Sequence, residues 1–406
     1  MKITYLNKIF YLIVSVSIFI SLFFNIDSAG SGGFVIDFSS TWPLVENPLN
    51  FNTNLEMKFP LHYYIASLIY LIVGEKELLR LVYCFIGLFV PFLFFICLKK
   101  KFKNIDKNNL FLFSLIIFLL PSFRSSIVWP NTQITGMIFF LISLYYFLEW
   151  EIQKKFNYFS KSLFLTIFFM SLTVYSRQIY AIIFIYFVII FFIKLKKKIF
   201  LVSCSVIGLF ASPGIVFVYF WPRILRATFD LKLYNSLVIN ASIISLYLIP
   251  FFSIIYFFTK ERLSIDIKKK TALILCILFV CICSLFFDYN YYLGGGFFIK
   301  LSVLLFDNLI FFFISSILGF YLLFLLTLNN NLNTILILLI LFGVSAYIIF
   351  MKYFEPMFIL VLFLLLKTKY VNLFLVSKKN IYLYHGYFLM YLSAAIVNNF
   401  FLLTKI

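Results

Sequence analysis

Three carboxylates in one long polar segment near the amino terminus have the chemistry of a general base. Asp37, Glu46 and Glu56 lie between residues 25 and 77, the longest stretch that separates two apolar runs. A carboxylate held beside a hydroxyl or an amine can remove its proton during group transfer. We predict that one of the three acids acts in this way and that the other two are ordinary solvated side chains.

Arginine is the second residue type with a chemical signature. The chain has six arginines, and most of them fall at the ends of apolar runs: Arg80, Arg124, Arg177, Arg223, Arg226 and Arg262. The planar guanidinium binds phosphate or carboxylate through two parallel hydrogen bonds. The set therefore predicts an anionic ligand at a membrane surface. The alternative for each arginine is that it reaches lipid headgroups or pairs with a nearby acid.

Other polar side chains have weaker signals. Trp42, His62 and Tyr63 share the polar segment with the acids and are candidate substrate contacts, although a histidine between aromatic neighbours is more typical of an interface residue. The six cysteines fall inside apolar runs without metal-ligand spacing. We predict no metal site and no cofactor. Gly294, Gly295 and Gly296 form a plain turn or a close approach of the backbone to a ligand.

The elements that hold these residues must cross a membrane. Of the 406 residues, 64% are hydrophobic and only 12% are charged, which is too little charge to cover a soluble domain. The uninterrupted apolar run 181–192 excludes the alternation of a β-barrel strand. We expect an all-α, polytopic transmembrane bundle formed by residues 1–406 as one domain, with no separate soluble domain. The net charge of +19 resides in short lysine clusters, which argues against nucleic acid as a partner.

The apolar runs predict about thirteen spans of membrane-crossing length. They lie near residues 6–24, 78–98, 109–121, 132–149, 162–176, 179–193, 199–219, 236–258, 271–287, 302–326, 334–350, 355–366 and 382–402. The lysine clusters place the amino terminus and the segments around 99–107, 154–161, 194–198, 260–270 and 367–379 in the cytoplasm. Residues 25–77 and five of the six arginines then face the other side. Trp129, Trp150 and Trp221 are predicted to lie at the membrane interface.

Three placements depend on lesser features. Residues 60–73 are apolar but short, so we expect a helix in the outer interface or a re-entrant segment. The first apolar run resembles a signal peptide, but its length favours an uncleaved first helix. The richness in Lys, Asn, Ile and Phe suggests an AT-rich genome. This favours a bacterial inner membrane with a periplasmic site over the endoplasmic reticulum membrane.

The order of these features resembles the GT-C superfamily of membrane glycosyltransferases, which take sugars from polyprenyl or dolichyl phosphates. That superfamily includes protein mannosyltransferases, aminoarabinose transferases and dolichyl-phosphate-glucose glucosyltransferases. The resemblance rests on Asp37 as the early acid, Phe59–Tyr64 as a His-Pro-Pro-Leu-like segment, Leu79-Arg80-Leu81, Lys99–Lys101, Ser176-Arg177-Gln178 and Lys352–Pro356. Asp37 stands farther from the first helix than the acid of the family does, and one proline of the second motif is absent.

The resemblance implies a fold, a reaction and a set of site residues. It implies a GT-C-like bundle whose long first outer loop carries interfacial helices. Asp37 would deprotonate an acceptor hydroxyl, with Glu46 or Glu56 as alternatives, and the sugar would transfer with inversion. Donor phosphate would be bound by Arg124, Arg177, Lys352, Arg223 and Arg226. The partners would be a polyprenyl-phosphate sugar, a lipid-linked or protein acceptor and membrane lipids.

Two other classes of protein have the same overall pattern. An O-antigen-type polysaccharide polymerase or ligase also has outer loops rich in arginine, but its largest loop usually comes late in the chain. A lipid-linked oligosaccharide flippase or other transporter predicts charged residues within spans and helices broken by glycine or proline. Asp307, Pro213 and Pro250 lie within predicted spans and are the features that favour this alternative.

Overall fold

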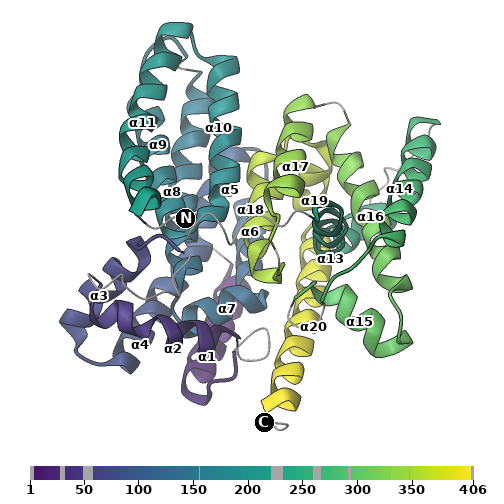
Figure 1. Cartoon of the computed structure of the whole chain (residues 1–406), viewed down its shortest axis with the longest axis horizontal. Coiled ribbons are helices and arrows are strands. Elements are labelled where there is room, and N and C mark those ends of the chain that lie inside the picture. The colour runs from purple at the N-terminus through teal and green to yellow at the C-terminus, as the bar shows by residue number, and fades with distance from the viewer. Residues whose placement is uncertain are drawn as a thin grey trace. The chain divides into compact units, whose positions relative to one another are not determined.

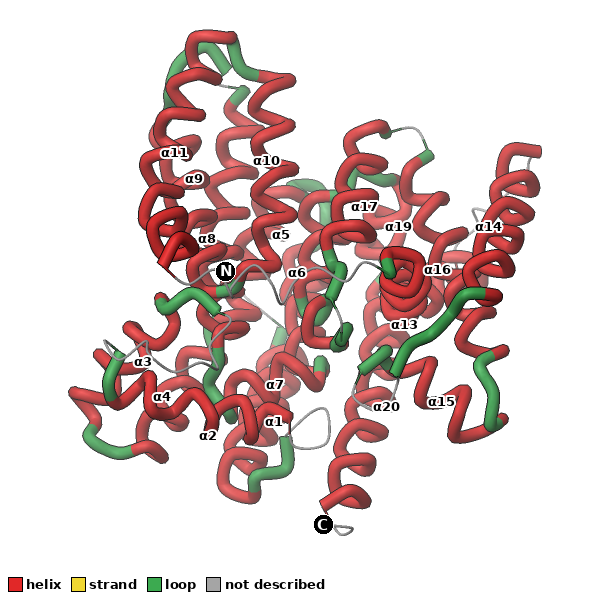
Figure 2. The backbone as a smooth tube through the Cα atoms, in the orientation of Figure 1, coloured by secondary structure: helices red, strands yellow, loops and turns green. Residues whose placement is uncertain are grey.

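The computed structural model describes residues 4–27, 33–48, 58–154, 156–220, 232–258, 267–290, 294–328, 330–346 and 348–403. In these residues every regular element is helical (Figure 2). Six helices are long and apolar enough to cross a membrane: Tyr5–Phe24, Lys76–Lys101, Thr132–Gln153, Lys197–Phe220, Leu233–Phe258 and Ile310–Thr327. The predicted all-α class is confirmed for the described residues, and several of their helices are long and apolar enough to span a membrane.

Two further candidate spans are bent within the membrane-crossing length. Lys107–Leu119 meets Pro121–Val128 at 70°, and Met351–Leu365 meets Lys369–Val376 at 100°. Counting each bent pair as one span raises the number of candidate spans from six to eight. The predicted number of about thirteen requires shorter apolar helices to cross as well and stays a prediction.

The first of two compact units comprises Met1–Leu225 and His385–Ile406. Its helices are α1 (Tyr5–Phe24), α2 (Gly33–Glu46), α3 (Leu61–Val73), α4 (Lys76–Leu88), α5 (Val90–Lys101), α6 (Lys107–Ser114), η1 (Leu115–Leu119), α7 (Pro121–Val128), α8 (Thr132–Gln153), α9 (Lys161–Ser176), η2 (Gln178–Tyr180), α10 (Ala181–Lys194) and α11 (Lys197–Phe220). Helices α8 to α11 stand side by side, and α2, α3 and α4 lie across one end of them (Figure 1).

The second unit, Arg226–Tyr384, is built around one central helix. Helix α13 (Leu233–Phe258) is almost wholly buried. Around it are α14 (Ile267–Leu285), α15 (Phe297–Phe306), α16 (Ile310–Thr327), α17 (Asn331–Gly343), η3 (Met351–Tyr353), α18 (Met357–Leu360), the π-helical turn η4 (Val361–Leu365) and α19 (Lys369–Val376). The last helix, α20 (Lys378–Leu403), begins in this unit and ends in the first.

Local packing changes several predicted elements. The span predicted at 302–326 is two helices, because Asp307 adopts a left-handed conformation (φ 51°) that ends α15. Pro43 lies inside α2, directly after Trp42. Trp129 and Trp150, predicted at the membrane interface, are buried by other side chains of the chain, and Trp221 lies outside the described residues. The first packs beneath Arg80 and the second among phenylalanines.

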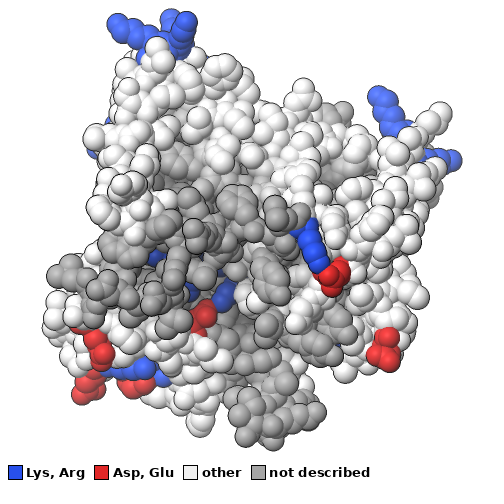
Figure 3. Space-filling model, in the orientation of Figure 1, with Lys and Arg blue, Asp and Glu red and all other residues white. Residues whose placement is uncertain are grey.

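Contacts within the first unit join segments that the predicted topology places on the same side of the membrane. On the predicted cytoplasmic side, Lys100 pairs with Glu149 and Lys194 with Glu151. The side chain of Asn7 donates to the carbonyl of Asn108 there as well. Exposed lysines also gather where α10 meets α11 (Figure 3). The candidate site lies at the opposite, predicted outer ends of these helices.

Candidate functional site

Residues 25–77, predicted to form the first outer loop, supply two short helices, α2 and α3, to one end of the first unit. Helix α3 contacts α2 on one side and the helices α4, α8 and α9 on the others. Asp37 lies on α2 with a half-buried side chain, one residue before Phe38, whose ring is fully buried. The loop therefore holds its candidate acid on a packed helix, which is how a rigid scaffold positions a reactive group.

The side chain of Lys76 and the ring of Trp129 pack against the aromatic residues of α2. Lys76 Nζ lies 5.0 Å from the ring centroid of Phe38 and 4.9 Å from that of Trp42. The Phe38 ring in turn packs 5.9 Å from Trp129. Cation–π pairs of this kind contribute about 0.5–1 kcal/mol each at exposed sites. Trp42 Nε1 donates to Glu46 Oε1 at 2.7 Å. Trp42, a predicted substrate contact, is thus hydrogen-bonded to the exposed Glu46, one of the two alternative bases.

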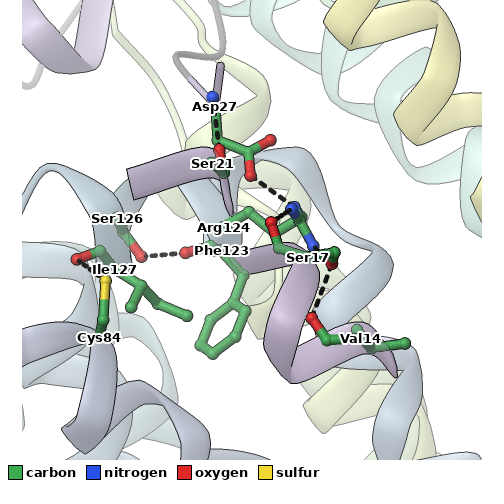
Figure 4. A network of polar contacts seen from close by, with 9 residues as sticks. All are labelled: Val14, Ser17, Ser21, Asp27, Cys84, Phe123, Arg124, Ser126 and Ile127. Atoms are coloured by element: carbon green, nitrogen blue, oxygen red, sulfur yellow. Dashed lines mark hydrogen bonds and ion pairs between the residues drawn. The ribbon is translucent and has the colours of Figure 1, made fainter. Parts of the chain in front are cut away.

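A buried ion pair joins the first helix to α7 (Figure 4). Arg124 Nε lies 2.6 Å from Asp27 Oδ2, and both side chains are no more than 4% exposed. The two terminal nitrogens of Arg124 donate to the hydroxyl and the carbonyl of Ser17. The backbone amide of Asp27 donates to Ser21 Oγ. Arg124 was predicted to bind the donor phosphate, but its three nitrogens are all engaged within the chain.

Arg80 is a second buried arginine at this end of the unit. Its Nε donates to the carbonyl of Val128, and its terminal nitrogens donate to Glu77 and to Asn25. The guanidinium carbon lies 3.6 Å from the ring centroid of Trp129, which fits cation–π stacking. Arg80 thus links the end of α1, the start of α4 and the end of α7.

His62 and Tyr63 are core residues at the start of α3. Each is 1% exposed, which corrects the prediction of an interface histidine. His62 Nδ1 lies 2.8 Å from Thr135 Oγ1 of α8. Burial, and then the nearby charge of Lys58, lower the pKa of His62 to about 3, against a smaller opposing effect from the carbonyl of Pro130. The imidazole is therefore neutral at physiological pH and serves as a packing and hydrogen-bonding group.

Arg177 occupies a tight corner where α9 ends. It has an extended backbone, and its amide donates to the carbonyl of Thr173 at 2.8 Å. Its Cβ packs on Gly136 of α8 so closely that a Cβ on that glycine would lie 3.1 Å away. The ring of Tyr180, just beyond the corner, stacks 4.7 Å from Phe140. The half-buried Arg177 side chain thus projects from a backbone that is held on two sides.

Lys352 belongs to the second unit. It lies in η3 with Nζ 5.0 Å from the ring of Phe350. The neighbouring backbone holds the glycine loop, because Gly295 donates to the carbonyl of Ile349 at 2.9 Å. A Cβ on Gly294 or Gly296 would lie 2.6 Å from a neighbouring atom, and Gly295 and Gly296 have φ of 86°. Close packing within the chain therefore explains the three glycines.

Some predicted site residues lie outside the described residues, namely Glu56, Arg223 and Arg226. Within the described ranges, no group of three or more His, Cys, Asp or Glu side chains comes together as a metal site.

Sequence reasoning did not assign site roles to Asp27, Thr135 and Gly136, and it included Arg80 only in the set of arginines expected to bind an anion. Asp27 had one usable signal, because it stands directly after the first apolar helix, where the resembled family carries its acid more often than at the position of Asp37. The partners of Thr135 and Gly136 lie 40 or more residues away in the chain, so no local pattern could reveal them. Arg80 has one local partner, Glu77, three residues earlier, whereas its contacts with Asn25 and Val128 are distant in sequence.

A scan against protein-family models, a search of curated proteins and a search of solved structures each found no match. The case for function therefore rests on the chain itself.

Proposed function

We propose that this chain is a membrane glycosyltransferase of GT-C type. It would move a sugar from a polyprenyl-phosphate donor to a lipid-linked glycan, lipid or protein acceptor on the non-cytoplasmic face of the membrane. The proposed location is a bacterial inner membrane with the site in the periplasm, with the endoplasmic reticulum membrane as the alternative. The proposal keeps the predicted bundle of about thirteen spans.

The observation that carries the proposal is the arrangement of the first outer loop. Helix α3 packs against α2, which bears Asp37, and also against α9, which ends directly before Arg177. A carboxylate and a guanidinium from segments far apart in sequence thus belong to the same end of one unit. Transfer from a phosphate donor needs one group to accept a proton and another to stabilise the departing phosphate.

The proposed reaction is a single inverting displacement. Asp37 accepts the proton of the acceptor hydroxyl, and the hydroxyl oxygen forms a bond to the anomeric carbon of the sugar. The bond from that carbon to the phosphate oxygen breaks, and the electron pair leaves with the polyprenyl phosphate. Arg177 stabilises the charge that develops there. The roles of Lys352, Arg223 and Arg226 stay predictions from the sequence, whereas we assign Arg124 to holding the first helix.

Purified protein in detergent with radiolabelled polyprenyl-phosphate sugars and membrane-extracted acceptors tests this proposal. Asp37→Asn should lower kcat by about 100-fold or more while the protein stays folded, because a general base is lost. Glu75→Gln is the matched control, since Glu75 is an exposed acid in the same loop.

Other outcomes would change the assignment. If Glu46→Gln or Glu56→Gln abolished turnover while Asp37→Asn retained it, the class would stand and the base would be another acid. A folded wild-type protein without turnover on any donor would rule out the transferase.

A lipid-linked oligosaccharide flippase or transporter is the second candidate. Two observations favour it: the helix pairs bent by 70° and 100°, and the ion pair between Arg124 and Asp27 buried beside one of these bends. Discontinuous helices with buried charges are typical of transport sites. Proteoliposomes would then move a labelled lipid-linked oligosaccharide between leaflets without releasing polyprenyl phosphate. An O-antigen-type polymerase or ligase would instead join glycans into longer products.

A further inference from the structure

The candidate span α11 contains a proline that interrupts its hydrogen-bond ladder. Pro213 has no N–H, so the carbonyl of Leu209, four residues earlier, cannot be paired in the usual way. The hydroxyl of Ser212 donates to that carbonyl at 2.8 Å. A side chain thus satisfies a backbone group that lipid could not hydrogen-bond.

The next position of the ladder is bridged by a residue from another helix. The amide of Gly214 donates to the hydroxyl of Tyr175 at 2.9 Å, and that hydroxyl donates to the carbonyl of Phe210. A regular helix pairs these same two backbone groups directly. A Cβ on Gly214 would lie 2.9 Å from the Tyr175 ring, so the glycine makes room for the inserted side chain. A side chain inserted into the ladder is a recognised cause of helix distortion.

Tyr175 also contacts the first outer loop and precedes the arginine corner. Its ring packs 5.4 Å from Phe59, which lies two residues before the start of α3, and Phe59 packs 5.8 Å from Phe217 of α11. Arg177 follows only two residues later. Tyr175 therefore joins α11, the loop helix α3 and the backbone that carries Arg177.

We infer that Tyr175 is a positioning residue for phosphate binding by Arg177. Its hydroxyl, held by Gly214 and Phe210, fixes the end of α9, while Gly136 fixes the next residues from the other side. These contacts restrict the backbone of Arg177, so its guanidinium is held in one position for binding polyprenyl phosphate. This inference rests on the proposed function, because that proposal makes Arg177 a ligand of the donor phosphate.

Tyr175→Phe tests the inference because it removes the hydroxyl and keeps the ring that packs on Phe59. We expect the Kd for polyprenyl phosphate alone to rise about 5- to 50-fold, and kcat/KM for the polyprenyl-phosphate sugar to fall by at least the same factor. Deuterium uptake in peptides covering residues 209–217 should increase as well. Tyr219→Phe is the matched control, since Tyr219 lies on α11 with its side chain 80% exposed.

A double-mutant cycle separates positioning from a general structural effect. If Tyr175 acts through Arg177, Tyr175→Phe should weaken binding much less in an Arg177→Lys background than in the wild type. Additive losses, or faster deuterium uptake without a change in Kd, would overturn the inference. If polyprenyl phosphate bound in an Arg177-dependent way but no sugar were transferred, the transferase proposal would be rejected and the positioning role of Tyr175 would stand. No binding of polyprenyl phosphate by the wild type would remove both.

Discussion

At the scale of single residues, the two buried arginines of the first unit are structural groups. Arg124 and Arg80 donate to Asp27, Ser17, Glu77 and Asn25, as well as to backbone carbonyls. A buried guanidinium must have such partners, because an uncompensated charge away from water is very costly. Arg177, by contrast, has a half-buried side chain.

The buried pair of Asp27 and Arg124 gives a stability prediction. Asp27→Asn or Arg124→Met should each lower the free energy of unfolding by about 3–5 kcal/mol, because each leaves the other charge buried without its counter-charge. The double variant should recover much of that loss. Unfolding of the purified protein in detergent measures the effect.

An exposed ion pair in the second unit is the control. Asp288→Asn breaks the contact with Lys232, and the two side chains are 80% and 46% exposed. Its effect should stay below about 1 kcal/mol. Equal losses at the buried and the exposed pair would show that burial of Asp27 and Arg124 does not determine their contribution.

At the scale of helices, small residues bring α13 and α16 together. Ser242 and Ser315 share a hydrogen bond of 2.7 Å between their hydroxyls, and Ser316 donates to the carbonyl of Val238 at 3.0 Å. Gly319 lies against the backbone of Ala241. Membrane helices associate through such close backbone packing, because burial of apolar surface offers no advantage over lipid.

Gly319→Ala should destabilise the protein by about 1–3 kcal/mol through overpacking. A Cβ at this position would lie 2.0 Å from the carbonyl oxygen of Ala241, so the two helices must separate. Thermal unfolding in detergent measures the loss. Gly208→Ala is the matched control, since nothing lies within 4 Å of its Cβ position on α11. That variant should be neutral or stabilising by about 0.5–1 kcal/mol. A Gly319→Ala protein as stable as this control would contradict the packing argument.

At the scale of the molecule, each unit has contacts that agree with one topology. In the second unit, Asn333 donates to the carbonyl of Lys367 on the predicted cytoplasmic side, and Gly295 donates to Ile349 on the other side. In a chain that crosses a bilayer repeatedly, every second loop between spans lies on the same face of the membrane. These contacts agree with the predicted grouping of connections, whereas the prediction of which face is cytoplasmic rests on the charge bias of the sequence alone.

Cysteine labelling in intact cells tests this orientation. A membrane-impermeant maleimide should label Ser40→Cys, on the exposed face of α2, from outside the cytoplasm. Lys197→Cys, in the exposed lysine cluster at the start of α11, should react only after the membrane is permeabilised. Labelling of the native cysteines in the unsubstituted chain provides the background. The reverse pattern of access would invert the topology and move the candidate site to the cytoplasm.

Composition and periodicity alone determined the class of the fold and most of its helices. Predicted spans such as 6–24, 162–176 and 236–258 agree closely with α1, α9 and α13. The physical reason is that lipid forces each crossing segment to be apolar, helical and of nearly constant length, and these properties are local in sequence. The lysine clusters likewise mark one side of the membrane without any knowledge of packing.

Only the tertiary structure decided which polar groups meet. Arg124 is 97 residues from Asp27, and His62 is 73 residues from Thr135, so neither pair leaves a local pattern. The same holds for Tyr175, whose hydroxyl enters the backbone ladder of a helix that begins more than 20 residues later. Side-chain type predicts that a buried polar group needs a partner. The identity of the partner follows from how the helices pack, because that packing sets which distant residues come within hydrogen-bonding distance.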